Sequence, residues 1–361
     1  MKKLYLSTLA LSLSLFSFIS EAETFEADGL NYNITGDNTC EVAEGAYDGD
    51  IVIPETVIND GKEFTVTGIG ERAFELTSVT TVEIPETVTT IGDWAFLDCS
   101  DLVEINIPNS VTYLGFYALG CCYALETATL STSITVIDEE LFRDCSSLTS
   151  IIIPEGVTEI KEDAFYGCSA LENVQLPSTL RVLGEYVFAE CSSLKYIELP
   201  EGLTSLGYSL FQRAALTGCK LPSTLEKIDA CAFYQCSGMT EIELPASLRT
   251  IGGSAFYGCS KLMKITSLPT VPPIIEKESS FAQSTYDNAR VIVQADAVES
   301  YSGDDMWSKF ASIESLSTSG INDAVCNSAN DAKLYDLRGV ETDRASHKGI
   351  YIKNNKKYLA R

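Results

Sequence analysis

Residues 148–170 read LTSIIIPEGVTEIKEDAFYGCSA, and this stretch decides the fold. Its Ile151-Ile152-Ile153 corresponds to Val82-Glu83-Ile84 and Ile197-Glu198-Leu199 elsewhere in the chain, where polar and apolar side chains alternate as in a strand with one buried face. Pro154 ends that strand, because proline cannot donate the next hydrogen bond of a ladder. The later Ala164-Phe165 and Cys168 fit a short helical turn with its apolar side inward. We therefore predict one strand and one helical turn from these 23 residues.

The same pattern returns along most of the chain at a step of 23 residues, with one step of 22. An Ile/Leu-Pro pair marks the end of the strand at positions 53, 84, 107, 153, 176, 199, 221, 244 and 268. The aromatic position is filled by Phe74, Phe96, Phe142, Phe165, Phe188, Phe211, Phe233 and Phe256, with Leu119 standing in once. One unit cannot bury its own apolar face, whereas stacked units share a continuous core. The spacing predicts a solenoid with parallel strands.

This unit resembles the 23-residue repeat of bacterial BspA-like leucine-rich-repeat surface proteins, with copies over residues 64–268. The resemblance implies a leucine-rich-repeat solenoid, capped at both ends. It extends to residues 23–63 as an N-terminal cap and to residues 269–316 as a C-terminal cap. Caps are also required physically, since a terminal repeat would otherwise expose its apolar edge.

The first 22 residues are expected to be an export signal that is removed. Lys2 and Lys3 precede an apolar run from Leu4 to Ile19, and the small-x-small pattern at 20–22 fits a cleavage site. The run is short for a membrane span, and no second apolar stretch is long enough to cross a bilayer. We expect a chain that is secreted or displayed at the outer cell surface.

The C-terminal residues differ from the repeats in composition. Residues 317–331 are small and polar and read as a linker. Residues 332–361 hold eight Lys or Arg against three Asp or Glu, whereas residues 23–331 hold 15 against 47. This small basic β tail is similar to the C-terminal sorting tails of the type IX secretion route, although it is shorter than a full tail domain. A simple β-hairpin appended to the solenoid is the alternative.

Charge and residue usage narrow the function classes. The formal net charge of −26 makes nucleic acid and anionic lipid poor partners. The single histidine, His347, lies in the tail, so the repeats lack the imidazole that most hydrolytic triads and metal sites need. No phosphate-binding loop is present. Carboxylates are abundant, but no motif places two of them in one cleft. We expect no enzyme activity, no metal and no cofactor.

Twelve cysteines in an exported chain would ordinarily predict disulfides. Here their spacing argues for free, buried thiols that act as small apolar side chains. The position three residues after the aromatic one holds Cys99, Cys122, Cys145, Cys168, Cys191, Cys236 and Cys259, with Ala214 standing in once. Cys219 falls at an inward strand position. A disulfide among Cys40, Cys121, Cys231 and Cys326 stays open.

The remaining candidate site is the outward side of the strands, where solenoids generally bind ligands. Two outward rows are expected, one from Glu83 to Glu243 and one from Thr81 to Glu241. Their ligand-binding candidates are Glu83, Glu104, Tyr196, Glu198, Lys220, Glu241 and Glu243. A second set of aromatics lies on the turn side, at Trp94, Tyr117, Tyr166, Tyr186, Tyr234 and Tyr257. Packing between repeats explains these aromatics as well as sugar binding does.

The family resemblance implies an adhesin that binds a protein ligand, either a host matrix protein or a protein on another cell. Fold alone does not fix function. A surface glycan-binding protein for nutrient capture is the main alternative, and it requires exposed aromatic faces on the turn side. Burial of Trp94, Tyr186 and Tyr257 would contradict it.

Overall fold

The computed structural model describes residues 23–316 and the backbone of four short tail segments, 334–336, 341–342, 349–353 and 356–360. The predicted export signal, the linker at 317–331, Cys326 and His347 lie outside the described residues. The chain divides between Leu171 and Glu172. We call residues 23–171 the N-terminal unit and residues 172–316 the C-terminal unit, and describe each by itself.

The N-terminal unit begins with a sheet that precedes the regular repeats. Three antiparallel hairpins contribute to it, and two of them turn at an Asp-Gly pair with positive φ, Asp28-Gly29 and Asp60-Gly61. Such pairs favour the tight turn whose twist matches antiparallel strands. Tyr32 and Phe64 are buried beneath this sheet, and Phe25 stacks on Tyr32 at 5.3 Å between ring centroids. The strands are β1 (Thr24–Ala27), β2 (Leu30–Gly36), β3 (Thr39–Val42), β5 (Thr56–Asn59) and β6 (Lys62–Ile69).

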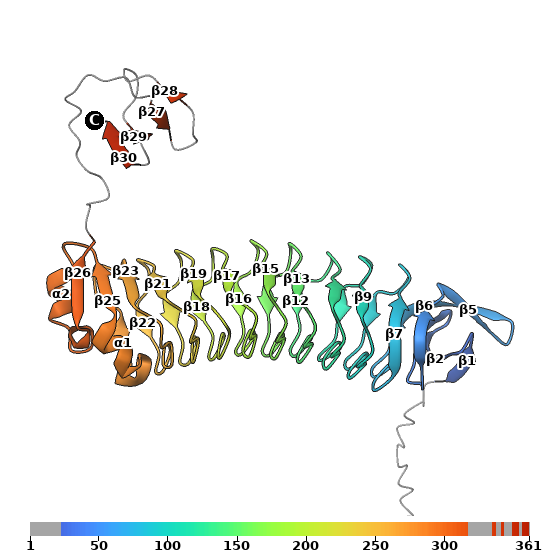
Figure 1. Cartoon of the computed structure of the whole chain (residues 1–361). Helices are drawn as coiled ribbons and strands as arrows, with labels where there is room; N and C mark the ends of the chain where they lie inside the picture. The colour runs from blue at the N-terminus through green and yellow to red at the C-terminus, as the bar shows by residue number, and fades with distance from the viewer. Residues whose placement is uncertain (1–22, 317–333, 337–340, 343–348, 354–355, 361) are drawn as a thin grey trace, which may run out of the picture. The chain divides into compact units, whose positions relative to one another are not determined.

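The predicted leucine-rich-repeat solenoid is confirmed in both units, where strands from successive repeats lie parallel and side by side (Figure 1). In the N-terminal unit these strands are β4 (Asp48–Val52), β7 (Ser78–Glu83), β9 (Glu104–Asn106), β11 (Thr127–Thr129) and β13 (Ser150–Ile152). In the C-terminal unit they are β15 (Asn173–Gln175), β17 (Tyr196–Glu198), β19 (Gly218–Lys220), β21 (Glu241–Leu244), β23 (Lys264–Ser267), β25 (Arg290–Val293) and β26 (Ser312–Ser315).

Each repeat also contains a second, two-residue strand that the sequence analysis did not predict. Its second residue is buried, as at Ile91 and Ile228, and its first residue faces outward or partly outward. In the N-terminal unit these strands are β8 (Thr90–Ile91), β10 (Tyr113–Leu114), β12 (Val136–Ile137) and β14 (Glu159–Ile160). In the C-terminal unit they are β16 (Val182–Leu183), β18 (Ser205–Leu206), β20 (Lys227–Ile228), β22 (Thr250–Ile251) and β24 (Ile274–Ile275).

The turn around the Ala-Phe pair has helix-like bonds but does not continue as a helix. Leu97 N–H donates to Trp94 O and Cys99 N–H donates to Phe96 O, each spanning three residues. Trp94 and Asp98 both have positive φ, which interrupts the right-handed path. Backbone N–H groups then turn toward the next repeat, where Phe96 N–H donates to Ala118 O at 2.8 Å. These turns stack as a further ladder on what we call the turn side.

The core of each unit contains stacked aromatic rings among buried aliphatic side chains and cysteines, and Leu119 takes the place of one ring in the N-terminal unit. Phe74 and Phe96 stack at 4.9 Å between centroids in the N-terminal unit. In the C-terminal unit Phe233 stacks on Phe211 at 5.4 Å and on Phe256 at 5.1 Å. All of these side chains are fully buried. Successive repeats are one strand spacing apart, and this distance also sets the separation of the stacked rings.

The C-terminal unit ends with the described helices of the chain, η1 (Glu278–Ser280), α1 (Gln283–Asn288), α2 (Val298–Ser302) and η2 (Trp307–Lys309). Phe281, Trp307 and Phe310 pack at the end of the ring column, and the Trp307 indole N–H donates to Pro273 O at 2.7 Å. The tail has strands β27 (Leu334–Asp336), β28 (Glu341–Thr342), β29 (Gly349–Lys353) and β30 (Lys356–Ala360). They form an antiparallel sheet in the order β28-β27-β29-β30, which is more than the single hairpin considered above.

Candidate functional site

The outward side chains of the longer strands form what we call the strand face. The alternation along each strand decides which residues it contains. In β9, for example, Ile105 is buried while Glu104 and Asn106 are exposed. The parallel register then places equivalent residues next to each other, so Thr81, Glu104 and Thr127 follow one another across β7, β9 and β11.

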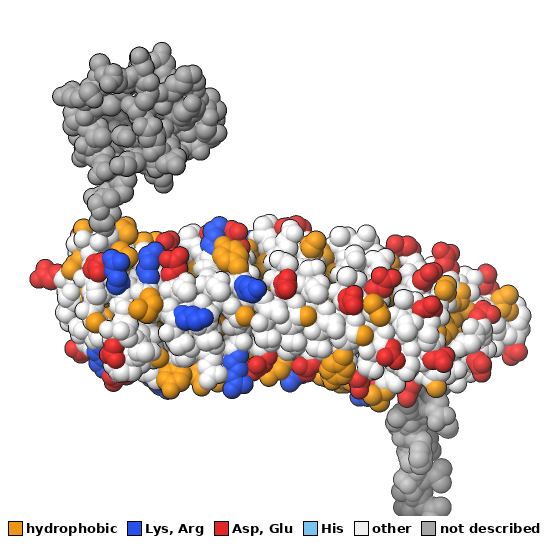
Figure 2. Space-filling view, viewed as in Figure 1, with side chains coloured by type: hydrophobic (Ala, Val, Ile, Leu, Met, Phe, Trp, Pro, Cys, Tyr) orange, Lys and Arg blue, Asp and Glu red, His pale blue; other side chains and the backbone are white. Residues whose placement is uncertain are grey.

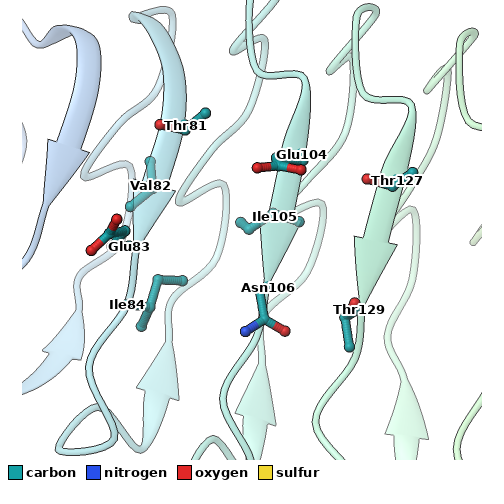
Figure 3. A pocket seen from close by; sticks show the side chains of 9 residues that line it. All are labelled: Thr81, Val82, Glu83, Ile84, Glu104, Ile105, Asn106, Thr127 and Thr129. Atoms are coloured by element: carbon teal, nitrogen blue, oxygen red, sulfur yellow. The ribbon is translucent and has the colours of Figure 1, made fainter.

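The strand face of the N-terminal unit contains a hollow of about 340 Å³. Figure 3 shows the polar side chains of three neighbouring strands around it. Its lining side chains on the outward rows are Thr81, Glu83, Glu104, Asn106, Thr127 and Thr129. The two predicted ligand-binding residues Glu83 and Glu104 thus lie at one site, and both are exposed.

The carboxylates around this hollow differ in how they are held. Asp50 of β4 accepts hydrogen bonds from the hydroxyls of Thr80 (2.7 Å) and Thr81 (2.8 Å), and these bonds lower the pKa of its carboxyl. By contrast, Glu83 and Glu104 have no hydrogen-bond or ion-pair partner for their side chains among the described residues. Their carboxylates are therefore free to accept bonds from a ligand.

The strand face of the C-terminal unit carries acidic residues that already have cationic partners. Glu198 pairs with Lys220, Glu241 with Lys264 at 2.8 Å, and Glu314 with Arg290 at 3.0 Å between Oε1 and Nε.

Each of these pairs joins two neighbouring strands. Bonds from Arg290, then from Ser312, lower the pKa of Glu314 to about 2. Three of the predicted site residues, Glu198, Lys220 and Glu241, are thus bound to each other or to a neighbour.

The two other predicted residues of this unit have no such partner. Glu243 is exposed, and its side chain makes no ion pair within the described part of the chain. Tyr196 is 54% exposed and lies directly beside Gly218 in the strand register.

Sequence reasoning missed several members of the strand face. Lys264 lies 23 residues after Glu241 and could have been found by one further step of the repeat. Asp50 lies 31 residues before Thr81, its partner in the strand register, and this irregular spacing hides it.

Acidic residues are concentrated in the N-terminal unit. Residues 23–171 hold 28 Asp or Glu and only four Lys or Arg, whereas residues 172–316 hold 17 and 11. On the face shown in Figure 2, acidic side chains gather over the strands drawn blue and cyan in Figure 1, and basic side chains lie mainly over those drawn yellow and orange. The local acidity that the rows suggested near Glu241 and Glu243 is offset by Lys264, whereas that of the N-terminal unit is not.

The turn-side aromatics are neither fully buried nor fully open. Trp94 is half-buried, with the Arg72 guanidinium 4.5 Å from its ring centroid. Tyr186 is half-buried against Tyr208, and Tyr257 is exposed while stacking on Tyr234. Packing between repeats therefore accounts for much of their surface. These aromatics are not buried enough to contradict the glycan-binding alternative.

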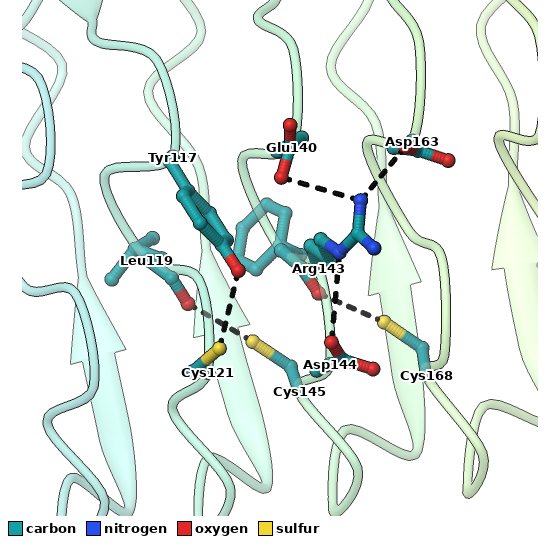
Figure 4. Close-up of polar contacts among 10 residues, drawn as sticks. Tyr117, Leu119, Cys121, Glu140, Arg143, Asp144, Cys145, Asp163 and Cys168 are labelled. Carbon is teal, nitrogen blue, oxygen red and sulfur yellow. Dashed lines mark hydrogen bonds and ion pairs between the residues drawn. The ribbon is translucent and has the colours of Figure 1, made fainter.

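The repeat cysteines are free thiols that bond to the backbone of the previous repeat. Cys99 donates to Phe74 O at 3.0 Å, and Cys145 donates to Leu119 O at 3.1 Å (Figure 4). Burial raises the pKa of the Cys99 thiol to about 11, so it stays protonated and able to donate. Cys40, Cys121 and Cys231 are also free thiols, while Cys326 is not described.

A cluster of charges lies on the turn side of the N-terminal unit. Arg143 bridges Glu140 (3.3 Å) and Asp163 (2.8 Å) (Figure 4). Its guanidinium also lies 4.7 Å from the ring centroid of Tyr166. Burial, opposed by Arg143, raises the pKa of Asp163 to about 6. Each acid here has a partner, so the cluster is not an open site.

Within the part of the chain that the structure describes, no three His, Cys, Asp or Glu side chains are grouped so as to hold a metal ion. None of the described helices is long and apolar enough to span a bilayer.

The chain is similar to several known proteins. Among solved structures, the chain resembles a leucine-rich repeat protein from Bacteroides ovatus, with 27% identity over 75% of this chain and 88% of that chain, and a TM-score of 0.45. It also resembles a leucine rich cell surface protein from Faecalibacterium prausnitzii, with 21% identity over 82% of this chain and 95% of that chain, and a TM-score of 0.46. No curated protein matches.

A family model described as the BspA type leucine rich repeat region matches residues 67–180 and 158–286, in six copies. These residues cover more than half of the chain and include the strands that form the hollow. The chain therefore belongs to the BspA-type leucine-rich-repeat family.

Proposed function

We propose that this protein is exported, is displayed at the cell surface or secreted, and binds a protein partner through the strand face of its N-terminal unit. The observation that carries the proposal is the hollow at Glu83 and Glu104, where two exposed carboxylates have no partner among the described residues. Solenoids use such extended faces for ligands because many repeats contribute side chains to one surface.

Adhesion to a host matrix protein or to another cell is the role that we propose for this binding. Membership of the BspA-type family supports it, as does the export signal read from residues 1–22. The descriptions of the family and of the similar structures name repeat proteins and no enzyme. Binding, rather than catalysis, is therefore the activity to test first.

The test is a binding screen of the mature chain, residues 23–361, against an array that carries matrix proteins and glycans. Two variants with the same charge change locate the surface: Glu83→Lys with Glu104→Lys, and Glu241→Lys with Glu243→Lys. We expect a saturable protein ligand whose affinity falls about tenfold or more in the first variant and far less in the second.

Each other outcome contradicts a stated part of the proposal. Equal losses in both variants would mean that bulk charge, not the hollow, attracts the ligand. A glycan ligand without a protein ligand would favour nutrient capture, with the turn-side aromatics as the next surface to mutate. No ligand of either kind would contradict the adhesin role.

A further inference from the structure

We propose that the hollow on the N-terminal strand face binds an extended protein segment that carries Lys or Arg between two apolar side chains. This inference rests on the proposed function and specifies the chemistry of the partner. It combines three features of the unit: an unneutralised acidic centre, two exposed apolar side chains on the same face, and uncommitted hydrogen-bonding groups.

Within residues 23–316 the acidic centre has no cationic partner. The N-terminal unit holds four cationic side chains, and all of them are engaged elsewhere. Arg72 pairs with Glu75 at 2.7 Å, and Lys161 pairs with Asp138 at 3.0 Å. The other two are Arg143, held in the turn-side cluster, and Lys62, which lies over the ring of Phe64. Among the described residues none supplies the positive charge that Glu83 and Glu104 lack, and a cationic ligand would fit there.

Apolar side chains flank this centre on the same face. Val52 of β4 and Ile152 of β13 are each 64% exposed. The strands from β4 to β11 are neighbours in one sheet, and β13 packs beside β11. Four strand steps of about 4.8 Å separate Val52 from Ile152, so roughly 19 Å lies between the two apolar groups. An extended segment covers that distance in about six residues.

Hydrogen-bonding side chains complete the surface. Asn106, Thr127 and Thr129 line the hollow, and no partner is found for their side chains among the described residues. They can bond to the backbone of an extended chain, which presents a donor and an acceptor at each residue. None of the residues that line the hollow is aromatic, so a stacking platform for sugars is lacking there. These features favour a polypeptide over a glycan.

The test uses the full mature chain and a labelled synthetic peptide, Leu-Thr-Lys-Thr-Lys-Thr-Leu, whose alternate side chains carry the apolar and cationic groups on one face. A copy with Glu in place of both Lys is the peptide control. Glu83→Gln with Glu104→Gln is the test variant, and Glu241→Gln with Glu243→Gln is the control variant with the same change in charge. Binding is followed by fluorescence anisotropy at physiological salt, and zero-length crosslinking of Lys to carboxylates locates the peptide.

We expect the test variant to weaken binding about tenfold or more and the control variant less than about threefold. Crosslinks should lie on Glu83 or Glu104. Replacing Val52 and Ile152 together by Ser should weaken the Leu-ended peptide but not a copy with Ser at both ends.

Equal losses in both carboxylate variants, or crosslinks spread over the acidic surface, would overturn the inference. If a matrix protein still binds the chain in the array experiment, that outcome leaves the proposed function standing and removes only the cationic segment as its ligand. Loss of both kinds of binding would remove the proposed function as well.

Discussion

The strand faces of the two units have the same backbone geometry, but they differ in whether their carboxylates are paired with cations. In the N-terminal unit, Glu83 and Glu104 have no cationic partner within the part of the chain that the structure describes. In the C-terminal unit, Glu198, Glu241 and Glu314 each pair with a cation on a neighbouring strand. Such exposed ion pairs add little stability, so their main effect is to leave these carboxylates less available to a ligand. A repeat architecture can therefore keep the same kind of core while different parts of its surface differ in the charges left for a ligand.

The largest effect on stability should come from the stacked rings that both units contain. Phe96→Ala and Phe233→Ala each remove a fully buried ring from the stacked column, one in each unit. Each should lower the free energy of unfolding by about 3–5 kcal/mol, which urea unfolding followed by circular dichroism would measure. Tyr123→Ala, at an exposed aromatic, is the control. A large loss in only one unit would show that the two cores differ as well as the surfaces.

Removing the cations of the C-terminal face should make it behave like the N-terminal one. Lys220→Gln with Lys264→Gln frees Glu198 and Glu241. We expect the cationic peptide to bind this variant about three- to tenfold more tightly, with crosslinks appearing on the freed carboxylates. Lys195→Gln with Lys261→Gln gives the same change in net charge at exposed residues outside the ion pairs. An equal gain in both variants would attribute the effect to net charge.

A pH effect should distinguish the turn sides of the units. Burial raises the pKa of Asp163 to about 6, and its counterparts in the C-terminal unit are Tyr186, Ser209, Cys231 and Ser254. The folded chain therefore binds this proton more tightly than the unfolded chain does. Stability should fall by about 1 kcal/mol as pH rises from about 4 to about 6, with partial exposure limiting the size.

Unfolding of the wild type and of Asp163→Asn across this pH range would test that sign. The asparagine has no carboxyl to titrate, so its part of the pH dependence should disappear. Glu126→Gln, at an exposed carboxylate outside this cluster, should leave the dependence unchanged. A stability that rises with pH through this window because of Asp163 would contradict the prediction.

The smallest effect concerns the left-handed turn positions. Leu76 has φ of 58° and is 71% exposed, while the equivalent positions 167 and 258 hold glycine. Leu76→Gly should raise the free energy of unfolding by about 0.5–1 kcal/mol, because glycine adopts positive φ without strain and little burial is lost. Leu76→Ala keeps the strain and should change stability much less. A destabilised glycine variant would mean that Leu76 makes contacts that matter.

The sequence alone determined the repeat and its inward pattern. The 23-residue step, the alternation around Ile105 and the aromatic position at Phe96 are local signals. Each recurs in most repeats, and this recurrence identifies the pattern. The alternation within one repeat shows which side of a strand is apolar, so the inward side chains can be identified without knowing the neighbouring repeats. The same signals placed Glu83 and Glu104 on the outward rows.

Which of those outward carboxylates have partners depends on how neighbouring strands pack, and the sequence does not reveal it. The partner of Glu241 is Lys264 on the next strand, and Asp50 is held by Thr80 and Thr81 across a cap whose spacing breaks the period. Pairing of this kind depends on strand register and on side-chain conformation between residues more than twenty positions apart. The left-handed turns at Trp94 and Asp98 arise likewise from bonds to the next repeat, not from helix propensity.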